Sequence, residues 1–224
     1  MKIHAIHRRR STTFLWHNFS TSLQMKIVPE QRKGARSVTR YSIKLPSLSS
    51  AKKLFHTARR NLLDVNAWHD IAGPGSAVFE IVNSRGEKIN NTVKKGNYLR
   101  ITISVIPGSP PGKGADWVKV EKINEEKNGN YESVAIAVRP APAPIDNEPE
   151  VAHFFGPDAT STFSIERKNR LVIAAVNGRN ETPNTKTNNL WTWIRNFLVA
   201  LGAMIGLNKP QWKSLVKGLI KKSL

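Results

Sequence analysis

Six segments between residues 76 and 177 have the alternating or continuously apolar pattern of β-strands, and turn-forming residues separate them. They are residues 76–82, 97–106, 116–123, 131–139, 159–167 and 170–177. The connection at residues 168–169 is short enough for a tight hairpin, and residues 128–130 form a turn that leads into the strand at residues 131–139. Because parallel strands need much longer crossovers, the series restricts this part of the chain to an antiparallel sheet.

Helical periodicity appears on both sides of this series. A short strand at residues 41–45 precedes a helix at residues 51–63, in which Leu54, Ala58 and Leu62 share one face. Two further helices are predicted at residues 190–205 and 210–222. Strands in an uninterrupted run with helices at the ends indicate an α+β fold. We expect one domain, residues 41–224, with a curved antiparallel sheet of about seven strands and a long C-terminal helix packed across it.

This order of elements resembles the helix-grip fold of the START-like superfamily, which includes polyketide cyclases and lipid-transfer domains. The resemblance covers residues 41–206. It rests on the early Trp in VNAWHDIAG, the strand pair AVFEIVNSRGE…GNYLRITI and the apolar helix LWTWIRNFLVALGAMIG. It implies a ligand cavity between sheet and helix, and it transfers no catalytic residue to this chain.

The net charge of +19 is concentrated at the two ends of the chain. Residues 46–181 are nearly neutral, whereas the flanking segments are basic and contain one acid, Glu30. Residues 1–40 are expected to form a basic, disordered extension, and residues 1–24 also have the composition of a targeting presequence. Aromatic residues do not alternate with these charges on a strand, so we do not expect a nucleic-acid partner.

Several kinds of chemistry are excluded or disfavoured by composition and spacing. The chain has no cysteine, which rules out disulfides and thiolate nucleophiles. Its six histidines lack the spacing of metal ligands on a helix, and the Pro- and Gly-rich residues 107–114 depart from a phosphate-binding loop. We therefore expect neither a metal nor a cofactor.

Small side chains on two predicted strands leave room beside the sheet. Ala135, Ala137 and Ala174 are expected to line the sheet–helix cavity together with Trp193 and Phe197. The predicted function is non-enzymatic binding of a small apolar or amphiphilic molecule. The alternative, that the helix fills this space, stays open because apolar interiors normally pack without voids.

A polar cluster around the last predicted hairpin is the candidate for binding an acidic head group. It comprises His153, Arg167, Arg179, Asn180 and Glu181. Arg179 offers the forked donor that a carboxylate or phosphate requires, or else it pairs with Glu181 to close the end of the sheet. A cyclase- or hydrolase-like enzyme with His153 or Glu181 as its base is a further alternative.

The last predicted helix is amphipathic. Its apolar stripe comprises Trp212, Leu215, Val216, Leu219 and Ile220, and Lys213, Lys217 and Lys221 recur on another face. The stripe either packs on its own domain or lies on an anionic membrane, with Trp212 and the three lysines at the surface. Residues 190–205 fit a core helix or a short membrane span. We expect a cytoplasmic, optionally membrane-associated protein, and no feature selects an oligomeric state.

Overall fold

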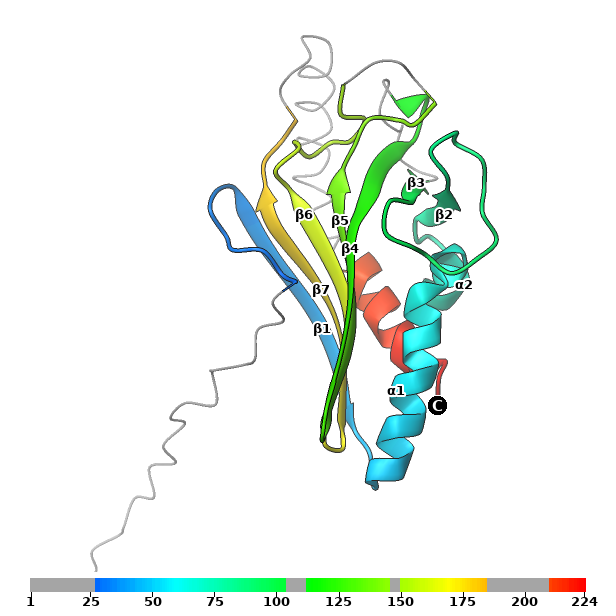
Figure 1. Ribbon diagram of the computed structural model, residues 1–224, viewed down its shortest axis with the longest axis vertical. Helices are drawn as coiled ribbons and strands as arrows, with labels where there is room; N and C mark the ends of the chain where they lie inside the picture. The colour runs from blue at the N-terminus through cyan, green and yellow to red at the C-terminus, as the bar shows by residue number, and fades with distance from the viewer. Residues whose placement is uncertain (1–26, 104–111, 146–149, 185–209) are drawn as a thin grey trace, which may run out of the picture.

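The chain folds into a seven-stranded antiparallel sheet with two helices packed across one face (Figure 1). The computed structural model describes residues 27–103, 112–145, 150–184 and 210–224. The sheet order is β1-β7-β6-β5-β4-β3-β2, so the first strand pairs with the last. This topology, with a C-terminal helix against the sheet, is the helix-grip arrangement predicted from the sequence.

The helices and strands are named in chain order. They are β1 (Ala35–Lys44), α1 (Leu48–Leu63), η1 (Val65–Ala67), α2 (Trp68–Ala72), β2 (Val78–Val82), β3 (Tyr98–Thr102), β4 (Asp116–Asn128), β5 (Tyr131–Pro140), β6 (Thr160–Lys168) and β7 (Leu171–Glu181). The chain is again helical at residues 210–221.

Helix α1 begins at a capping box. The hydroxyl of Ser47 accepts the N–H of Ser50 at 3.0 Å, and the Ser50 hydroxyl accepts the N–H of Ser47 at 3.2 Å. These bonds satisfy amides that the first helical turn leaves without partners. The buried positions follow helical spacing and include Leu54, Ala58 and Leu62, so α1 presents one apolar stripe to the sheet.

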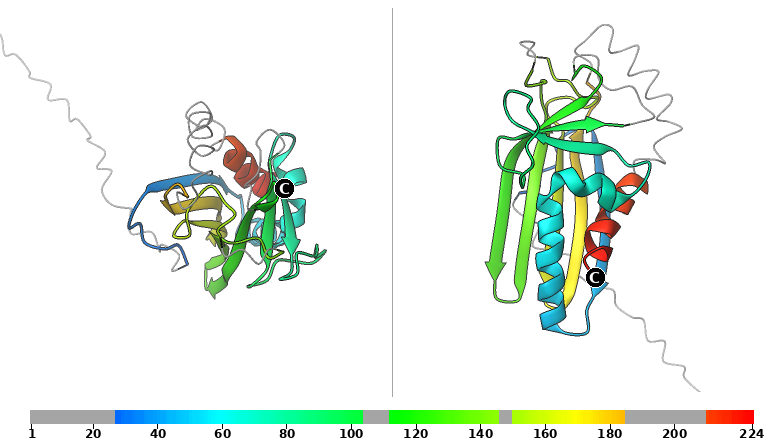
Figure 2. Two further views of the ribbon diagram at one scale, coloured as in Figure 1. Left: turned by 90° about the horizontal axis from the view of Figure 1, so that it is seen from above. Right: turned by 90° about the vertical axis from the view of Figure 1, so that its right-hand side faces the viewer.

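The helix at residues 210–221 contributes its whole apolar stripe to the main core. Leu215, Val216, Leu219 and Ile220 are all buried in the same cluster as the inward side chains of α1 and of the sheet. A Cβ added at Gly218 would lie 2.3 Å from the Ile71 carbonyl oxygen, so the small residue permits close approach to α2. Figure 2 shows this helix beside α1 on the same face of the sheet. Packing on its own domain, one of the two predicted roles, is therefore the observed one.

The two faces of the sheet differ in what covers them. On β5, Val134, Ile136 and Val138 belong to the main core beneath the helices. Ala135 and Ala137 alternate with them and contact Ile27 on the opposite side. We call the helix-covered side the inner face and the other side the outer face.

The folded part of the chain begins earlier than the sequence predicted. The predicted first strand started at residue 41, but β1 starts at Ala35 and pairs with β7 along its length. Residues 27–34, which we call the N-terminal arm, also contact the domain through Ile27 and several hydrogen bonds described below. The boundary at residue 41 was therefore wrong, because basic, polar residues on an edge strand do not have the alternating apolar pattern of a half-buried strand.

The predicted helix at residues 190–205 lies outside the described residues. Within the described part of the chain, no helix combines the length and the hydropathy required to span a bilayer.

Removing apolar volume from the C-terminal helix should destabilise the whole domain. We expect Leu219→Ala to lower the free energy of unfolding by about 2–5 kcal/mol, the usual cost of emptying a buried leucine site. Lys217→Ala, on the exposed side of the same helix, should change it by less than about 0.5 kcal/mol. Urea denaturation followed by circular dichroism measures both, and equal effects would contradict the packing of this helix.

Candidate functional site

Four aromatic rings meet on the inner face, between the sheet and the helices. The centroid of Trp68 lies 4.6 Å from that of Phe163 and 5.2 Å from that of Phe79. Trp212, on the C-terminal helix, lies 5.4 Å from Phe163 and 6.2 Å from Phe79. We call Trp68, Phe79, Phe163 and Trp212 the aromatic cluster. It joins β2, β6, α2 and the C-terminal helix in one apolar contact.

The aromatic cluster reaches the surface at Trp212. Trp68 is buried and its indole N–H donates to the Leu62 carbonyl at 3.1 Å, whereas Trp212 is only partly buried. Ile101 pairs with Phe79 across β2 and β3, and Ile101 and Ile103 are likewise partly buried against the core. Trp212, Ile101 and Ile103 are therefore partly exposed apolar residues that pack against the same core, and we call these three residues the apolar rim.

The small residues predicted to line one cavity lie on two different faces. Ala174 is buried in the main core on the inner face, as predicted. Ala135 and Ala137 face outward, where they contact Ile27 and Val28 of the N-terminal arm. Their placement beside Ala174 was wrong, because the apolar alternation of β5 on its own does not show which set of side chains meets the helix. Trp193 and Phe197 lie outside the described residues.

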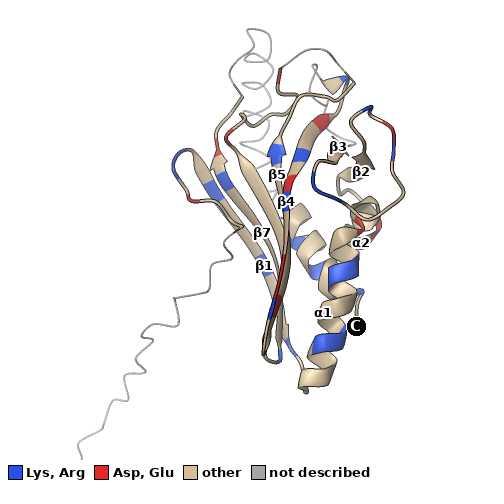
Figure 3. Ribbon diagram, in the orientation of Figure 1, with Lys and Arg blue, Asp and Glu red and all other residues tan. Residues whose placement is uncertain are grey.

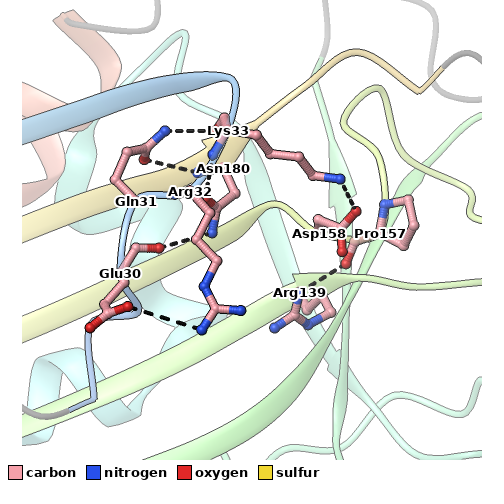
Figure 4. Close-up of polar contacts among 8 residues, drawn as sticks. All are labelled: Glu30, Gln31, Arg32, Lys33, Arg139, Pro157, Asp158 and Asn180. Carbon is pink, nitrogen blue, oxygen red and sulfur yellow. Dashed lines mark hydrogen bonds and ion pairs between the residues drawn. The ribbon is translucent and has the colours of Figure 1, made fainter.

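Asn180 anchors the N-terminal arm and does not face a free site (Figure 4). Its Oδ1 accepts the N–H groups of Arg32 at 2.7 Å and Lys33 at 3.2 Å, and its Nδ2 donates to the Glu30 carbonyl at 3.2 Å. Its own N–H donates to Oε1 of Gln31 at 3.1 Å. The residue has a φ of 54°, in the left-handed region that asparagine tolerates better than most residues. Asn180 thus supplies the partners for several polar groups of the arm.

The arm is fastened a second time on the adjoining loop. Lys33 Nζ lies 2.6 Å from the Asp158 carboxylate, and Arg139 donates to the Pro157 carbonyl at 2.9 Å (Figure 4). The Lys33–Asp158 pair is more than half exposed and contributes little by itself. Together with Asn180 it fixes the course of the arm across the ends of the strands.

Arg179 and Glu181 are both engaged by β1. Nη1 of Arg179 donates to the carbonyls of Gly178 at 2.7 Å and Ser37 at 3.3 Å, and the Glu181 carboxylate accepts the Ser37 hydroxyl at 3.1 Å. Burial lowers the pKa of Arg179, and the nearby Arg36 lowers it further. Burial also raises the pKa of Glu181, against the opposing effect of the Ser37 hydrogen bond.

Arg179 lies on the outer face and cannot meet the head group of a ligand on the inner face. Its position alternates with inner-face residues of β7 such as Ala174 and Val176. The role predicted for Arg179 at a sheet–helix cavity is therefore wrong.

Arg167 lies far from Arg179, at the other end of the same strand pair. In the β6–β7 register, Arg167 pairs with Val172 whereas Arg179 pairs with Thr160. Arg167 is fully buried. Its Nε donates to Glu132 at 2.7 Å, and its Nη1 donates to the carbonyls of Asn130 at 3.1 Å and Asn169 at 3.0 Å. Placing Arg167 in one polar cluster with Arg179 was wrong, since the two occupy opposite ends of β6.

His153 is a buried, neutral side chain. Its Nδ1 accepts the N–H of Phe155 at 2.9 Å, and its ring stacks on Phe154 with 4.3 Å between centroids. Burial lowers its pKa from 6.5 to about 3. Because one ring nitrogen is occupied and the protonated form is strongly disfavoured, His153 does not suit the predicted role of a base that gains a proton near neutral pH.

Two hollows among the described residues lie beside the core. The larger, about 720 Å³, is an open depression at the end of α1, lined by Arg59, Arg60, Asn61, Leu63, Asp64, Asn66, Asn90, Asn91 and Thr92. The smaller, about 260 Å³, lies between α1 and the β4–β5 hairpin. Both have mixed polar linings. No grouping of His, Asp and Glu that could hold a metal occurs within the described segments.

Two features of the polar chemistry were not predicted. The Glu132–Arg167 pair joins oppositely charged residues directly across β5 and β6. Such a pair can be recognised only when the register of the two strands is known. The anchoring role of Asn180 depends on chain segments about 150 residues apart, and local sequence contains no sign of it.

Comparison with known proteins finds structural likeness and no match in sequence. No family model matches the chain, and no curated protein does. The similar solved structures include a truncated norcoclaurine synthase from Thalictrum flavum, which is 11% identical to this chain. The match covers 86% of this chain and 99% of the synthase, with a TM-score of 0.37. Ara h 8.0201 has 10% identity over 84% of this chain and 98% of its own, with a TM-score of 0.34. The major latex-like protein 151 of Panax ginseng is 14% identical. The match covers 79% of this chain and 99% of the ginseng protein, with a TM-score of 0.32. Likeness at this level assigns no activity to this chain.

Breaking the buried Glu132–Arg167 ion pair should lower the free energy of unfolding far more than breaking an exposed ion pair. We expect Glu132→Ala to lower the free energy of unfolding by about 3–5 kcal/mol, because it leaves the Arg167 guanidinium buried without its carboxylate. The matched control is Glu125→Ala, which removes the bidentate partner of Arg59 at the surface. That variant should cost about 1 kcal/mol or less. Chemical denaturation compares the two variants. A similar decrease in the free energy of unfolding in both would refute the structural role of the buried pair.

His153 should make stability fall as the solution is acidified. Between pH 6.5 and about 3 the unfolded chain binds a proton that the folded protein excludes, so the free energy of unfolding decreases as pH falls. Above pH 6.5 the residue contributes no pH dependence. His153→Asn keeps an acceptor near Nδ1 and cannot titrate. The stability advantage of the wild type over this variant should shrink by about 2.7 kcal/mol between pH 8 and pH 4.5, because pH 4.5 lies two units below 6.5 and each unit is worth about 1.36 kcal/mol. A constant difference would show that His153 titrates normally.

Proposed function

We propose that this protein binds a small apolar or amphiphilic molecule at the inner face of its sheet, without catalysing a reaction on it. The supporting observation is the aromatic cluster, in which Trp212 is only partly buried and so presents part of an aromatic ring at the surface. Aromatic side chains at an apolar opening provide large contact areas at little conformational cost, which suits an apolar ligand.

The location differs from the one expected from the sequence. The proposed ligand contacts the apolar rim, formed by Trp212, Ile101 and Ile103, beside the aromatic cluster. It does not use Ala135, Ala137 or Arg179, which lie on the outer face. Asn180 and Arg167 are committed to structural hydrogen bonds, so polar recognition by these residues is not part of the proposal.

A binding role is favoured over catalysis because the two residues considered as bases are otherwise engaged. His153 is held neutral by burial, and the Glu181 carboxylate accepts the Ser37 hydroxyl. Glu181 also lies at the end of β7 next to β1, away from the apolar rim. Neither of the two candidate bases therefore adjoins the proposed binding surface.

Ligand binding can be tested directly on the full chain. Native mass spectrometry of gently purified protein shows whether an apolar molecule co-purifies, and oleate serves as the probe in a tryptophan-fluorescence titration. We expect saturable binding that Trp212→Ala weakens at least about tenfold, which corresponds to roughly 1.4 kcal/mol. Ser214→Ala, an exposed and uncharged position on the same helix, should bind as the wild type does.

Circular dichroism checks that Trp212→Ala is folded before its affinity is compared. An intermediate affinity for Trp212→Phe, which keeps an aromatic ring, would support direct contact with the ligand. The proposal fails if oleate does not bind and the native mass is that of the chain alone, or if Trp212→Ala and Ser214→Ala bind equally.

A further inference from the structure

Helix α1 and the C-terminal helix, which lie side by side on the inner face, carry positive charge and no acidic residue. Helix α1 and residues 210–224 contain no Asp or Glu. Figure 3 shows Lys and Arg recurring along both helices. The exposed cations are Lys52, Lys53, Arg60, Lys213, Lys217, Lys221 and Lys222. We call these seven side chains the cationic layer.

The cations of the two helices face the same side of the molecule. Both helices pack on the inner face, and their apolar positions are buried in one shared core. The exposed positions therefore point away from the sheet on both helices. Near their ends the helices are also joined, since Nδ2 of Asn61 donates to the Ser223 hydroxyl at 2.9 Å. The cationic layer thus belongs to one continuous surface.

The cationic layer is not neutralised by neighbouring carboxylates. None of its seven members forms an ion pair with another described residue, and Arg59 is the cation of α1 that pairs, with Glu125 at 2.6 Å. Lys222 donates to the backbone carbonyl of Asp70, and the Asp64 and Asp70 carboxylates lie at the border. Cations elsewhere do have acidic partners, as in Lys88–Glu80 at 3.1 Å and Arg139–Glu121 at 2.6 Å.

We propose that the cationic layer is a docking surface for an anionic lipid bilayer. Lysines spread over two neighbouring helices suit a broad, planar array of negative head groups, and such surfaces attract clustered basic residues. Leu224, two residues after Lys222, is 69% exposed, so an apolar side chain is available at the lipid boundary. No aromatic residue is among the large exposed hydrophobic side chains of the described segments, so base stacking has no platform there.

The mode of attachment differs from the insertion expected for an isolated amphipathic helix. The stripe of Leu215, Val216, Leu219 and Ile220 is committed to the core, and Trp212 packs against Phe79 and Phe163. The folded protein can therefore adsorb electrostatically without exposing that stripe. Attachment of this kind weakens as ionic strength rises, because salt screens charges at the surface. The inference is independent of ligand binding at the apolar rim.

The test is sedimentation of the full chain with vesicles of phosphatidylcholine alone or containing 30% phosphatidylserine. We expect binding to the anionic vesicles only, reversed by 0.5 M NaCl. The triple variant Lys213→Gln, Lys217→Gln, Lys221→Gln should bind about a hundredfold more weakly, at about fivefold for each cation removed. All three side chains are exposed, so the variant should keep its fold, and circular dichroism verifies this.

The matched control removes three exposed cations from the edge strand β1, namely Arg36→Gln, Arg40→Gln and Lys44→Gln. This control variant loses the same formal charge, but from the opposite face of the sheet. The basic residues before the N-terminal arm are present in every variant, so they do not affect the comparison. Near wild-type binding by this control, with loss in the lysine variant, supports the proposal. Equal losses in both variants, equal binding to neutral vesicles, or stronger binding to duplex DNA than to anionic vesicles at the same phosphate concentration would overturn it.

Discussion

The burial of one sheet face beneath two helices is the constraint on which the rest of the structure depends. The helices come from opposite ends of the chain, α1 directly after β1 and residues 210–221 at the C-terminus, and they share one apolar cluster with the inner face. An antiparallel sheet with one apolar face is not stable until something covers it. Because the cover includes the last residues of the chain, the core is complete only when those residues have docked.

The outer face satisfies different requirements. It has the small side chains of Ala135 and Ala137, and the N-terminal arm crosses part of it, fixed by Asn180.

At the far end of the strands, the buried Arg167 joins the β4–β5 and β6–β7 turns by donating to Asn130 and Asn169. The charged and amide groups that suggested a ligand site are thus used to close the two ends of the sheet. Buried arginine and asparagine side chains serve this purpose well, because each satisfies several backbone groups at once.

The fold was largely predictable because its determinants are local. Periodicity located every strand and the first helix, and the hairpin turns fixed the antiparallel order. The extent of β1 was not predictable, since Arg36, Ser37 and Arg40 are ordinary exposed residues whose pairing with β7 depends on distant contacts.

The candidate site was predicted less well than the fold. Small residues on β5 suggested space, but only the assembled sheet shows that Ala135 faces the arm. Charge at Arg179 suggested a ligand, whereas its partners are carbonyls provided by the fold.

The C-terminal helix contributes residues to both proposed surfaces, and this limits how they can act together. Trp212 and Lys213 are consecutive, so the apolar rim and the cationic layer adjoin along the C-terminal helix. A bilayer held against the cationic layer would lie beside the partly exposed Trp212. An amphiphile leaving the membrane would then reach the aromatic cluster without crossing much water, where exposed apolar surface is costly. Electrostatic attachment suits such exchange, because contacts screened by salt release more readily than an inserted apolar helix.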